Sequence, residues 1–238
     1  MPGLRREFAL RQEKAPEFLL AGDSTTAPTS AGGGGWGDGF ISILANGAKG
    51  ENFARNGQTT VSFQKGGQWG KLMDMLKGTV GKTRVYVTIQ FGHNDQKEKA
   101  GISDTEFSNN LKKLAGQVKS AGGVPILVTP LTRRTFSGGS PTDNLAKQRE
   151  LTLSAAKQGG YDVIDLNSES RRYVKAIGQQ AANKYNLKSD DYTHLNKLGK
   201  DVFGRMVSDL IIELKPELKQ YFKADPAMSA ALKQGKPI

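Results

Sequence analysis

The 238-residue sequence contains no cysteine. This absence excludes disulfide bonds, catalysis by a thiol and zinc sites with cysteine ligands, but it leaves the cellular compartment open. Histidine is also scarce, because only His93 and His194 are present. Histidine is the side chain that most often accepts or donates protons near neutral pH. Any chemistry that needs a histidine must therefore use one of these two positions.

Long apolar runs are absent too. No stretch approaches the roughly 20 apolar residues that a membrane-spanning helix needs, so we expect no membrane span. The first six residues, MPGLRR, lack the apolar stretch of a secretory signal peptide. The sequence by itself therefore predicts either an intracellular protein or one whose signal lies outside this sequence.

Acidic residues are few relative to basic ones. The chain has 34 Lys and Arg against 23 Asp and Glu, which gives a formal net charge of +11. Such an excess attracts nucleic acid, anionic lipid or acidic polysaccharide, and it is equally compatible with a soluble surface of mixed charge. The basic residues are spread along the chain, without zinc-finger spacing or an arginine-rich arm. Nucleic acid is therefore a disfavoured partner.

Short apolar runs typical of β-strands alternate with amphipathic segments of helical length. The predicted strands are residues 18–21, 52–54, 84–91, 124–129 and 161–166. The predicted helices are 104–121, which a capping box from Ser103 to Glu106 opens, then 143–158, 168–185 and a last helix from about residue 196. Residues 32–35 and 137–141 are expected to be loops.

This alternation predicts an α/β fold, with a parallel sheet covered by helices on both faces. No linker or change in composition divides the chain, so we expect one domain over residues 1–238. Residues 1–17 would form an N-terminal extension and 216–238 a basic C-terminal tail without a recognisable motif. In a sheet of flavodoxin-like strand order 2-1-3-4-5, ligands bind at the switch point between the first and third strands.

Two polar motifs follow those two strands. Ser24 lies in Gly-Asp-Ser-Thr directly after the first strand, and Asn94 lies in Gly-His-Asn-Asp directly after the third. The motifs thus converge on the expected binding crevice. A serine hydroxyl is a weak nucleophile unless a neighbouring base takes its proton. Taken alone, Ser24 could equally be the N-cap of a following helix.

The second histidine lies three residues after an aspartate. In a turn, this spacing lets the carboxylate of Asp191 reach the imidazole of His194 and fix its tautomer. Asp190 is an alternative partner, and a surface aspartate that merely precedes a histidine is the simpler interpretation of one isolated pair. Ser24, Asp191 and His194 nevertheless follow one of the orders in which hydrolytic triads occur.

Acyl transfer also needs hydrogen-bond donors for a developing oxyanion. The Asn94 side chain and the backbone N–H of Gly57, after the second strand, are candidates, although both positions are also typical of ordinary turns. A metal site built from His93, Asp95, Asp191 and His194 is a weaker alternative, because no recognised metal-ligand spacing is present. The glycine run 32–35 lacks the Lys-Ser/Thr ending of a phosphate loop.

Together these motifs resemble the SGNH, or GDSL-like, hydrolase superfamily. The four matching blocks are Gly22-Asp23-Ser24, Gly57, Gly92-x-Asn94-Asp95 and Asp191-x-x-His194, and the resemblance spans residues 18 to about 212. The Phe-Gly-His-Asn-Asp form of the third block and Gly35-Trp36-Gly37 are similar to the rhamnogalacturonan acetylesterase branch of carbohydrate esterases.

That resemblance implies a three-layer α/β/α fold with a five-stranded parallel sheet and no metal or other cofactor. It implies Ser24 as nucleophile, His194 as base and Asp191 as the partner that orients it. The Ser24 and Gly57 backbone N–H groups and the Asn94 side chain would form the oxyanion hole. The absence of cysteine departs from fungal members, which often carry disulfides.

We therefore expect a serine esterase that deacetylates a carbohydrate, a pectin-type acidic polysaccharide such as rhamnogalacturonan being favoured. The resemblance also favours secretion. Two alternatives stay open at this point. One is an esterase or lipase of the same superfamily that acts on lipid or small acyl esters. The other is a non-catalytic carbohydrate-binding protein that retains the fold.

Overall fold

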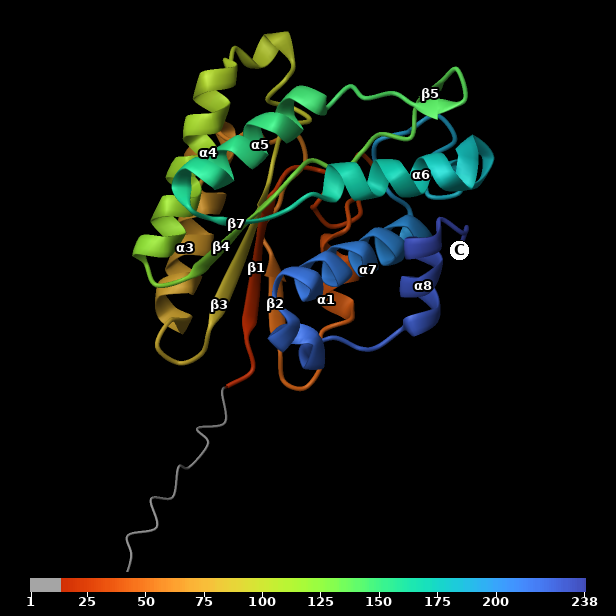
Figure 1. Cartoon of the computed structure of the whole chain (residues 1–238). Coiled ribbons are helices and arrows are strands. Elements are labelled where there is room, and N and C mark those ends of the chain that lie inside the picture. The colour runs from red at the N-terminus through yellow and green to blue at the C-terminus, as the bar shows by residue number, and fades with distance from the viewer. Residues whose placement is uncertain (1–13) are drawn as a thin grey trace, which may run out of the picture.

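The computed structural model describes residues 14–238 (Figure 1). Most of the predicted N-terminal extension, residues 1–13, lies outside the described residues. The strands are β1 (Glu17–Gly22), β2 (Lys49–Asn52), β3 (Val85–Gln90), β4 (Val124–Val128), β5 (Phe136–Ser137), β6 (Ser140–Pro141) and β7 (Asp162–Ile164). The helices are α1 (Gly37–Ser42), α2 (Ser62–Lys65), α3 (Gln68–Thr79), η1 (Glu98–Ala100), α4 (Asp104–Ser120), α5 (Ala146–Gly159), α6 (Leu166–Asn183), α7 (Lys197–Leu214), η2 (Pro216–Tyr221) and α8 (Pro226–Gln234).

Five parallel strands form the central sheet in the order β2-β1-β3-β4-β7. This is the predicted order 2-1-3-4-5, because β5 and β6 form a separate antiparallel hairpin and β7 is the fifth strand of the sheet. The predicted fold class is therefore confirmed. β1 is an interior strand that pairs with both β2 and β3, so the loops that follow these strands meet at one edge.

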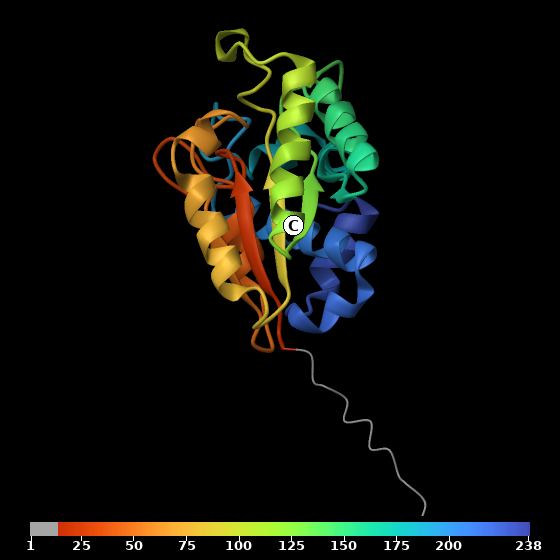
Figure 2. The same cartoon turned by 90° about the vertical axis from the view of Figure 1, so that its left-hand side faces the viewer.

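Helices cover both faces of the sheet. Helices α3, α4 and α5 lie on one side, and α1, α6, α7 and α8 lie on the other (Figures 1 and 2). The alternation of side chains along β1 explains the two cores: Phe18 and Leu20 pack into the core beneath α7, whereas Leu19 and Ala21 pack into the core beneath α4. A central strand buried on both faces needs the continuous apolar run that the sequence provides.

Several boundaries differ from those predicted. The second strand was predicted at 52–54 and instead spans Lys49–Asn52. It is an edge strand whose side chains are half-buried or exposed, so apolarity does not mark it. Beyond it the backbone still pairs with β1, because Phe53 N–H donates to Leu20 O. Part of the expected loop 137–141 forms the β5–β6 hairpin.

The predicted capping box is present at the start of α4. Ser103 is the N-cap residue, and its hydroxyl accepts a hydrogen bond from the Glu106 backbone N–H at 3.1 Å. The helix ends at Ser120, just before Gly122, whose φ of 87° requires glycine. Local sequence therefore determines both ends of this helix.

The basic C-terminal segment is folded, although no motif marked it. Three side chains of this segment are almost completely buried in the core that α7 covers: Leu218 in η2, Phe222 just after η2, and Leu232 in α8. Pro226 begins α8, and Asp225 caps it by accepting from the Met228 backbone N–H. Residues 216–238 thus pack on the domain rather than extend from it.

Candidate active site

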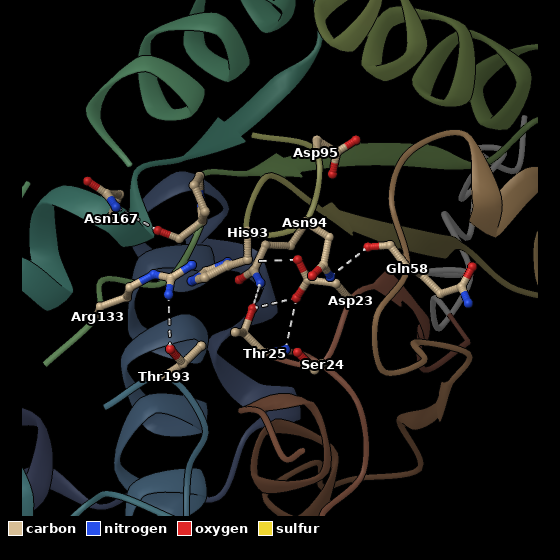
Figure 3. Close-up of polar contacts among 12 residues, drawn as sticks. Asp23, Ser24, Thr25, Gln58, His93, Asn94, Asp95, Arg133, Asn167 and Thr193 are labelled. Carbon is tan, nitrogen blue, oxygen red and sulfur yellow. Dashed lines mark hydrogen bonds and ion pairs between the residues drawn. The ribbon is translucent and has the colours of Figure 1, made fainter. Parts of the chain in front are cut away.

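Ser24 lies in a tight turn that follows the carboxyl end of β1. The Asp23 backbone carbonyl accepts from Thr26 and Ala27, and the Asp23 carboxylate accepts from both the backbone N–H and the hydroxyl of Thr25 at 2.8 Å (Figure 3). This turn reverses the chain immediately after β1 and holds the Ser24 side chain at the edge of the sheet. Ser24 therefore is not a helix N-cap.

The glycine run explains how this turn is supported. Gly35 N–H donates to Ala27 O, and Trp36 N–H donates to Thr25 O. A Cβ on Gly35 would lie only 2.0 Å from the Thr25 carbonyl, so only glycine permits this approach. The indole of Trp36 donates to Gln90, the last residue of β3, at 2.7 Å. The loop thus ties the Ser24 turn to the central sheet.

Asp191 and His194 come from the loop that precedes α7. One carboxylate oxygen of Asp191 accepts from the backbone N–H groups of Thr193 and His194, at 3.0 and 2.9 Å. The other oxygen lies 2.8 Å from His194 Nδ1. The two backbone N–H groups hold the carboxylate in place beside Nδ1 of the ring. The turn therefore fixes the orientation of the His194 imidazole. Asp190, the alternative partner, is exposed.

The structure brings Ser24 and His194 together across 170 residues of sequence. His194 Nε2 lies 2.8 Å from Ser24 Oγ, at the ring nitrogen opposite the one that faces Asp191. Burial alone would raise the pKa of the Asp191 carboxyl, but the hydrogen bonds from His194 and Thr193 outweigh that effect and lower it. Asp191 therefore stays ionised and favours a proton on Nδ1 of the ring, which leaves Nε2 free to accept.

Asn94 and Asp95 connect the loop after β3 to the loop after β2. The Asn94 amide donates to the backbone carbonyl of Gln58 at 3.0 Å (Figure 3), and Asp95 accepts from the backbone and hydroxyl of Thr60 at 2.8 and 2.7 Å. Gly57, which precedes Gln58, has a φ of 75° that favours glycine. Asn94 and Asp95 thus anchor the loop that contains the predicted backbone donor.

His93, the other histidine of the chain, lies beside Asp23, the residue that precedes Ser24. It is buried, with its Nδ1 3.7 Å from a carboxylate oxygen of Asp23. Burial, and then the nearby positive charge of Arg133, lower the pKa of His93 well below its ordinary value. Burial raises the pKa of Asp23 to about 6. His93 is therefore neutral at neutral pH, and it belongs to the support of the site.

The geometry does not favour the alternative metal site. His93 faces Asp23, Asp95 binds Thr60, and Asp191 pairs with His194. Within residues 14–238, no cluster of three or more His, Asp or Glu side chains is arranged to hold a metal ion. The four residues that a metal centre would need are thus committed to three separate contacts.

Two arginines near the site carried no signal in the sequence. Both follow β4. The buried Arg134 donates to Asn186 and to the His194 carbonyl, each at 2.6 Å, and so holds the loop that carries the histidine. Arg133 donates to the Thr193 hydroxyl at 3.4 Å (Figure 3). Only the tertiary structure places the loop after β4 against the loop before α7.

Within residues 14–238, no helix is both long enough and apolar enough to cross a bilayer.

The site and fold were compared with known proteins. Residues 20–202 match the GDSL-like Lipase/Acylhydrolase family. The chain is similar to the rhamnogalacturonan acetylesterase RhgT of Bacillus subtilis, with 28% identity over 225 residues that cover 88% of this chain and 95% of RhgT. It is also similar to the probable rhamnogalacturonan acetylesterase YesY of the same organism, with 26% identity, 84% of this chain and 94% of YesY being covered.

Among solved structures, the B. subtilis protein YxiM superposes with a TM-score of 0.72 and 27% identity, over 88% of this chain and 59% of that chain. The family match begins within β1 and covers the other strands, the Ser24 turn and the loop that contains His194. The resemblance inferred from the four sequence blocks is therefore confirmed. The chain belongs to the GDSL-like lipase/acylhydrolase family and is a carboxylic ester hydrolase.

Proposed function

We propose that this protein is a serine acetylesterase that deacetylates a carbohydrate, and that its substrate is a pectin-type acidic polysaccharide such as rhamnogalacturonan. The observation that carries the proposal is the chain of two 2.8 Å contacts from Asp191 through His194 to Ser24. This arrangement is what a serine needs to become a nucleophile at neutral pH. The names of RhgT and YesY support the carbohydrate acetyl ester as the substrate class.

In the proposed reaction, Ser24 Oγ attacks the acetyl carbonyl while its proton passes to His194 Nε2. The electron pair of the carbonyl moves to oxygen, and the resulting imidazolium is stabilised by Asp191. When the tetrahedral intermediate collapses, His194 returns the proton to the sugar oxygen and the carbohydrate leaves as an alcohol. Water, deprotonated by His194, then attacks the acetyl-Ser24 ester; the bond to Ser24 Oγ breaks, His194 returns the proton to that oxygen, and acetate leaves.

The oxyanion would be stabilised by the Ser24 and Gly57 backbone N–H groups and by the Asn94 side chain. An asparagine amide has two N–H donors, of which one is used toward Gln58 O at 3.0 Å. The other is available for the oxyanion. Lys97 Nζ donates to the side-chain oxygen Oδ1 of Asn94 at 2.6 Å. This bond holds the side-chain amide in the orientation that keeps its N–H groups at this edge.

The nucleophile is tested by Ser24→Ala, with acetate release from an acetylated pectin-type polysaccharide as the measurement. We expect the rate to fall by roughly 10³-fold or more, because without its nucleophile such a site keeps only residual catalysis. Ser120→Ala, an exposed serine at the end of α4, is the matched control and should retain full activity. An organophosphonate should label wild-type Ser24.

Undiminished acetate release by the Ser24→Ala protein would refute the serine mechanism. A panel of p-nitrophenyl esters of increasing acyl length tests the substrate class. Preference for long chains over acetate would assign the enzyme to the lipases of the family instead.

A further inference from the structure

Arg133 places a cation beside the candidate triad. It is half-buried in the loop after β4, and no carboxylate within residues 14–238 forms an ion pair with it. Among residues 14–238, the one hydrogen bond that its guanidinium makes is the long contact of 3.4 Å to the Thr193 hydroxyl. Its Nε is buried and has no acceptor among the described residues. A guanidinium has five N–H donors, so most of its capacity is unused.

The neighbouring Arg134 shows what a structural arginine looks like in this loop. Arg134 is fully buried, donates to Asn186 Oδ1 and to His194 O at 2.6 Å, and its backbone N–H donates to Tyr192 O at 2.8 Å. The loop that carries His194 is therefore already fixed without Arg133. A mainly structural role does not explain why Arg133 makes so little use of its donors.

Two carboxylates lie close enough for their charge to act on Arg133, namely Asp23 and Asp191. Neither forms an ion pair with Arg133: one Asp23 oxygen accepts from Thr25 and the other faces His93 Nδ1 at 3.7 Å, and Asp191 accepts from the turn and ring of His194. Partly removing an arginine from water is costly unless an anion compensates for it. The unused donors thus point to an anion that arrives with the substrate.

The position of Arg133 indicates which part of the substrate it meets. Its guanidinium contacts Thr193, the residue directly before His194 (Figure 3). In the proposed reaction His194 protonates the sugar oxygen, so the sugar must lie on the His194 side of the scissile bond. Arg133 is therefore on the side of the carbohydrate and not on the side of the acetyl group.

We propose that Arg133 binds the carboxylate of an acidic sugar next to the acetylated hydroxyl, and so selects uronate-containing substrates. This inference rests on the proposed function. A planar guanidinium can bind a carboxylate through two parallel hydrogen bonds, which a lysine cannot reproduce. Arg133 is thus a specificity-determining residue rather than a participant in the acyl transfer.

The test uses one acetylated galacturonate oligosaccharide in two forms, with free carboxylates and with the same carboxylates methyl-esterified. Acetate release is measured for both, because the scissile ester is identical in the two. For wild type we expect kcat/KM to be higher on the free acid. Arg133→Gln should lower kcat/KM on the free acid by about ten- to a hundredfold, mainly through KM, as expected for a lost charged hydrogen bond. Its activity on the methyl ester should change little.

Three further proteins make the result specific. Arg133→Lys keeps the charge but loses the planar fork, so it should recover only part of the loss. Lys82→Gln removes one positive charge at the opposite edge of the sheet, just before β3, and should match wild type on both substrates. Thr193→Val removes the only hydrogen bond that the Arg133 guanidinium makes to the described residues, and it should keep the preference for the free acid.

Equal losses on both substrates in Arg133→Gln, or an unchanged preference for the free acid, would overturn the inference. Reproduction of the Arg133→Gln loss by Thr193→Val would do the same, because it would make Arg133 a support for the loop. A wild-type enzyme that releases acetate from neither form would overturn the proposed function itself. Acetate release from the methyl ester alone would refute only the role of Arg133.

Discussion

At the scale of single residues, the two histidines of this chain have different surroundings. His194 is partly accessible and contacts Ser24, whereas His93 is buried beside Asp23. Burial shifts the pKa of both buried groups toward the neutral form, upward for Asp23 and downward for His93. These surroundings are the reason that we propose His194, and not His93, as the catalytic base.

The raised pKa of Asp23 has a consequence for stability. In the folded protein Asp23 titrates near pH 6, about two units above its ordinary value of 3.8. Between these values the folded state holds a proton that the unfolded state has lost, so raising the pH through this range favours unfolding. In Asp23→Asn this contribution is absent, while an acceptor for Thr25 is retained.

We expect Asp23→Asn to gain about 1–2 kcal/mol in free energy of unfolding relative to wild type when the pH rises from 5 to 7.5. Urea unfolding of both proteins at the two pH values measures this difference. Asp190→Asn, at an exposed aspartate, is the control and should follow the wild type. A constant difference between Asp23→Asn and wild type at both pH values would mean that Asp23 is ionised throughout.

At the scale of elements, the site depends on loops from four places in the chain. The loops after β1, β2 and β3 and the loop before α7 meet because parallel strands end at one edge. The fourth loop leads directly into α7, and η2 and α8 pack on the same core as α7. The C-terminal segment thereby supports the helix that follows the candidate histidine.

Leu232 tests whether the C-terminal segment belongs to the folded domain. It is 3% exposed and packs in the core on the α7 side. We expect Leu232→Ala to lower the free energy of unfolding by about 2–4 kcal/mol, because it leaves a cavity in that core. Lys233→Ala, the exposed neighbour on the same helix, should change it by less than about 0.5 kcal/mol. Equal and small effects of the two would show that α8 contributes little to the core.

At the scale of the whole molecule, the net charge of +11 is the feature that bears on substrate capture. A cationic protein attracts a polyanionic chain over distances that salt controls. The Debye length falls from about 10 Å at 0.1 M salt to about 3 Å at 1 M. Long-range attraction is distinct from the short-range contact that we propose for Arg133.

We therefore expect kcat/KM on acetylated pectin-type polymer to fall as salt rises from 0.1 to 1 M. Hydrolysis of neutral p-nitrophenyl acetate by the same enzyme should be nearly constant over that range, since no long-range charge is involved. Arg133→Gln should keep most of the salt dependence, because it removes one charge among many. If the curves for polymer and p-nitrophenyl acetate ran parallel, the basic surface would serve solubility rather than substrate capture.

Local sequence predicted most of the sheet and the catalytic candidates. Central strands such as β3 were recognisable because burial on both faces demands an unbroken apolar run, and the α4 cap because it needs only four adjacent residues. The Asp191–His194 contact was predictable for the same reason, since a single turn forms it. Edge strand β2 was misplaced because an exposed edge needs no apolar pattern.

What the tertiary structure alone decided are the contacts between segments that are distant in sequence. The 2.8 Å approach of Ser24 to His194, the packing of the glycine loop against the Ser24 turn and the burial of Leu232 from α8 in the core all join such segments. The environment of His93 belongs here as well, and so does the lack of an ion pair at Arg133 within residues 14–238. A residue's burial and its partners depend on the chains that pack around it, and that information is not present in the residues beside it.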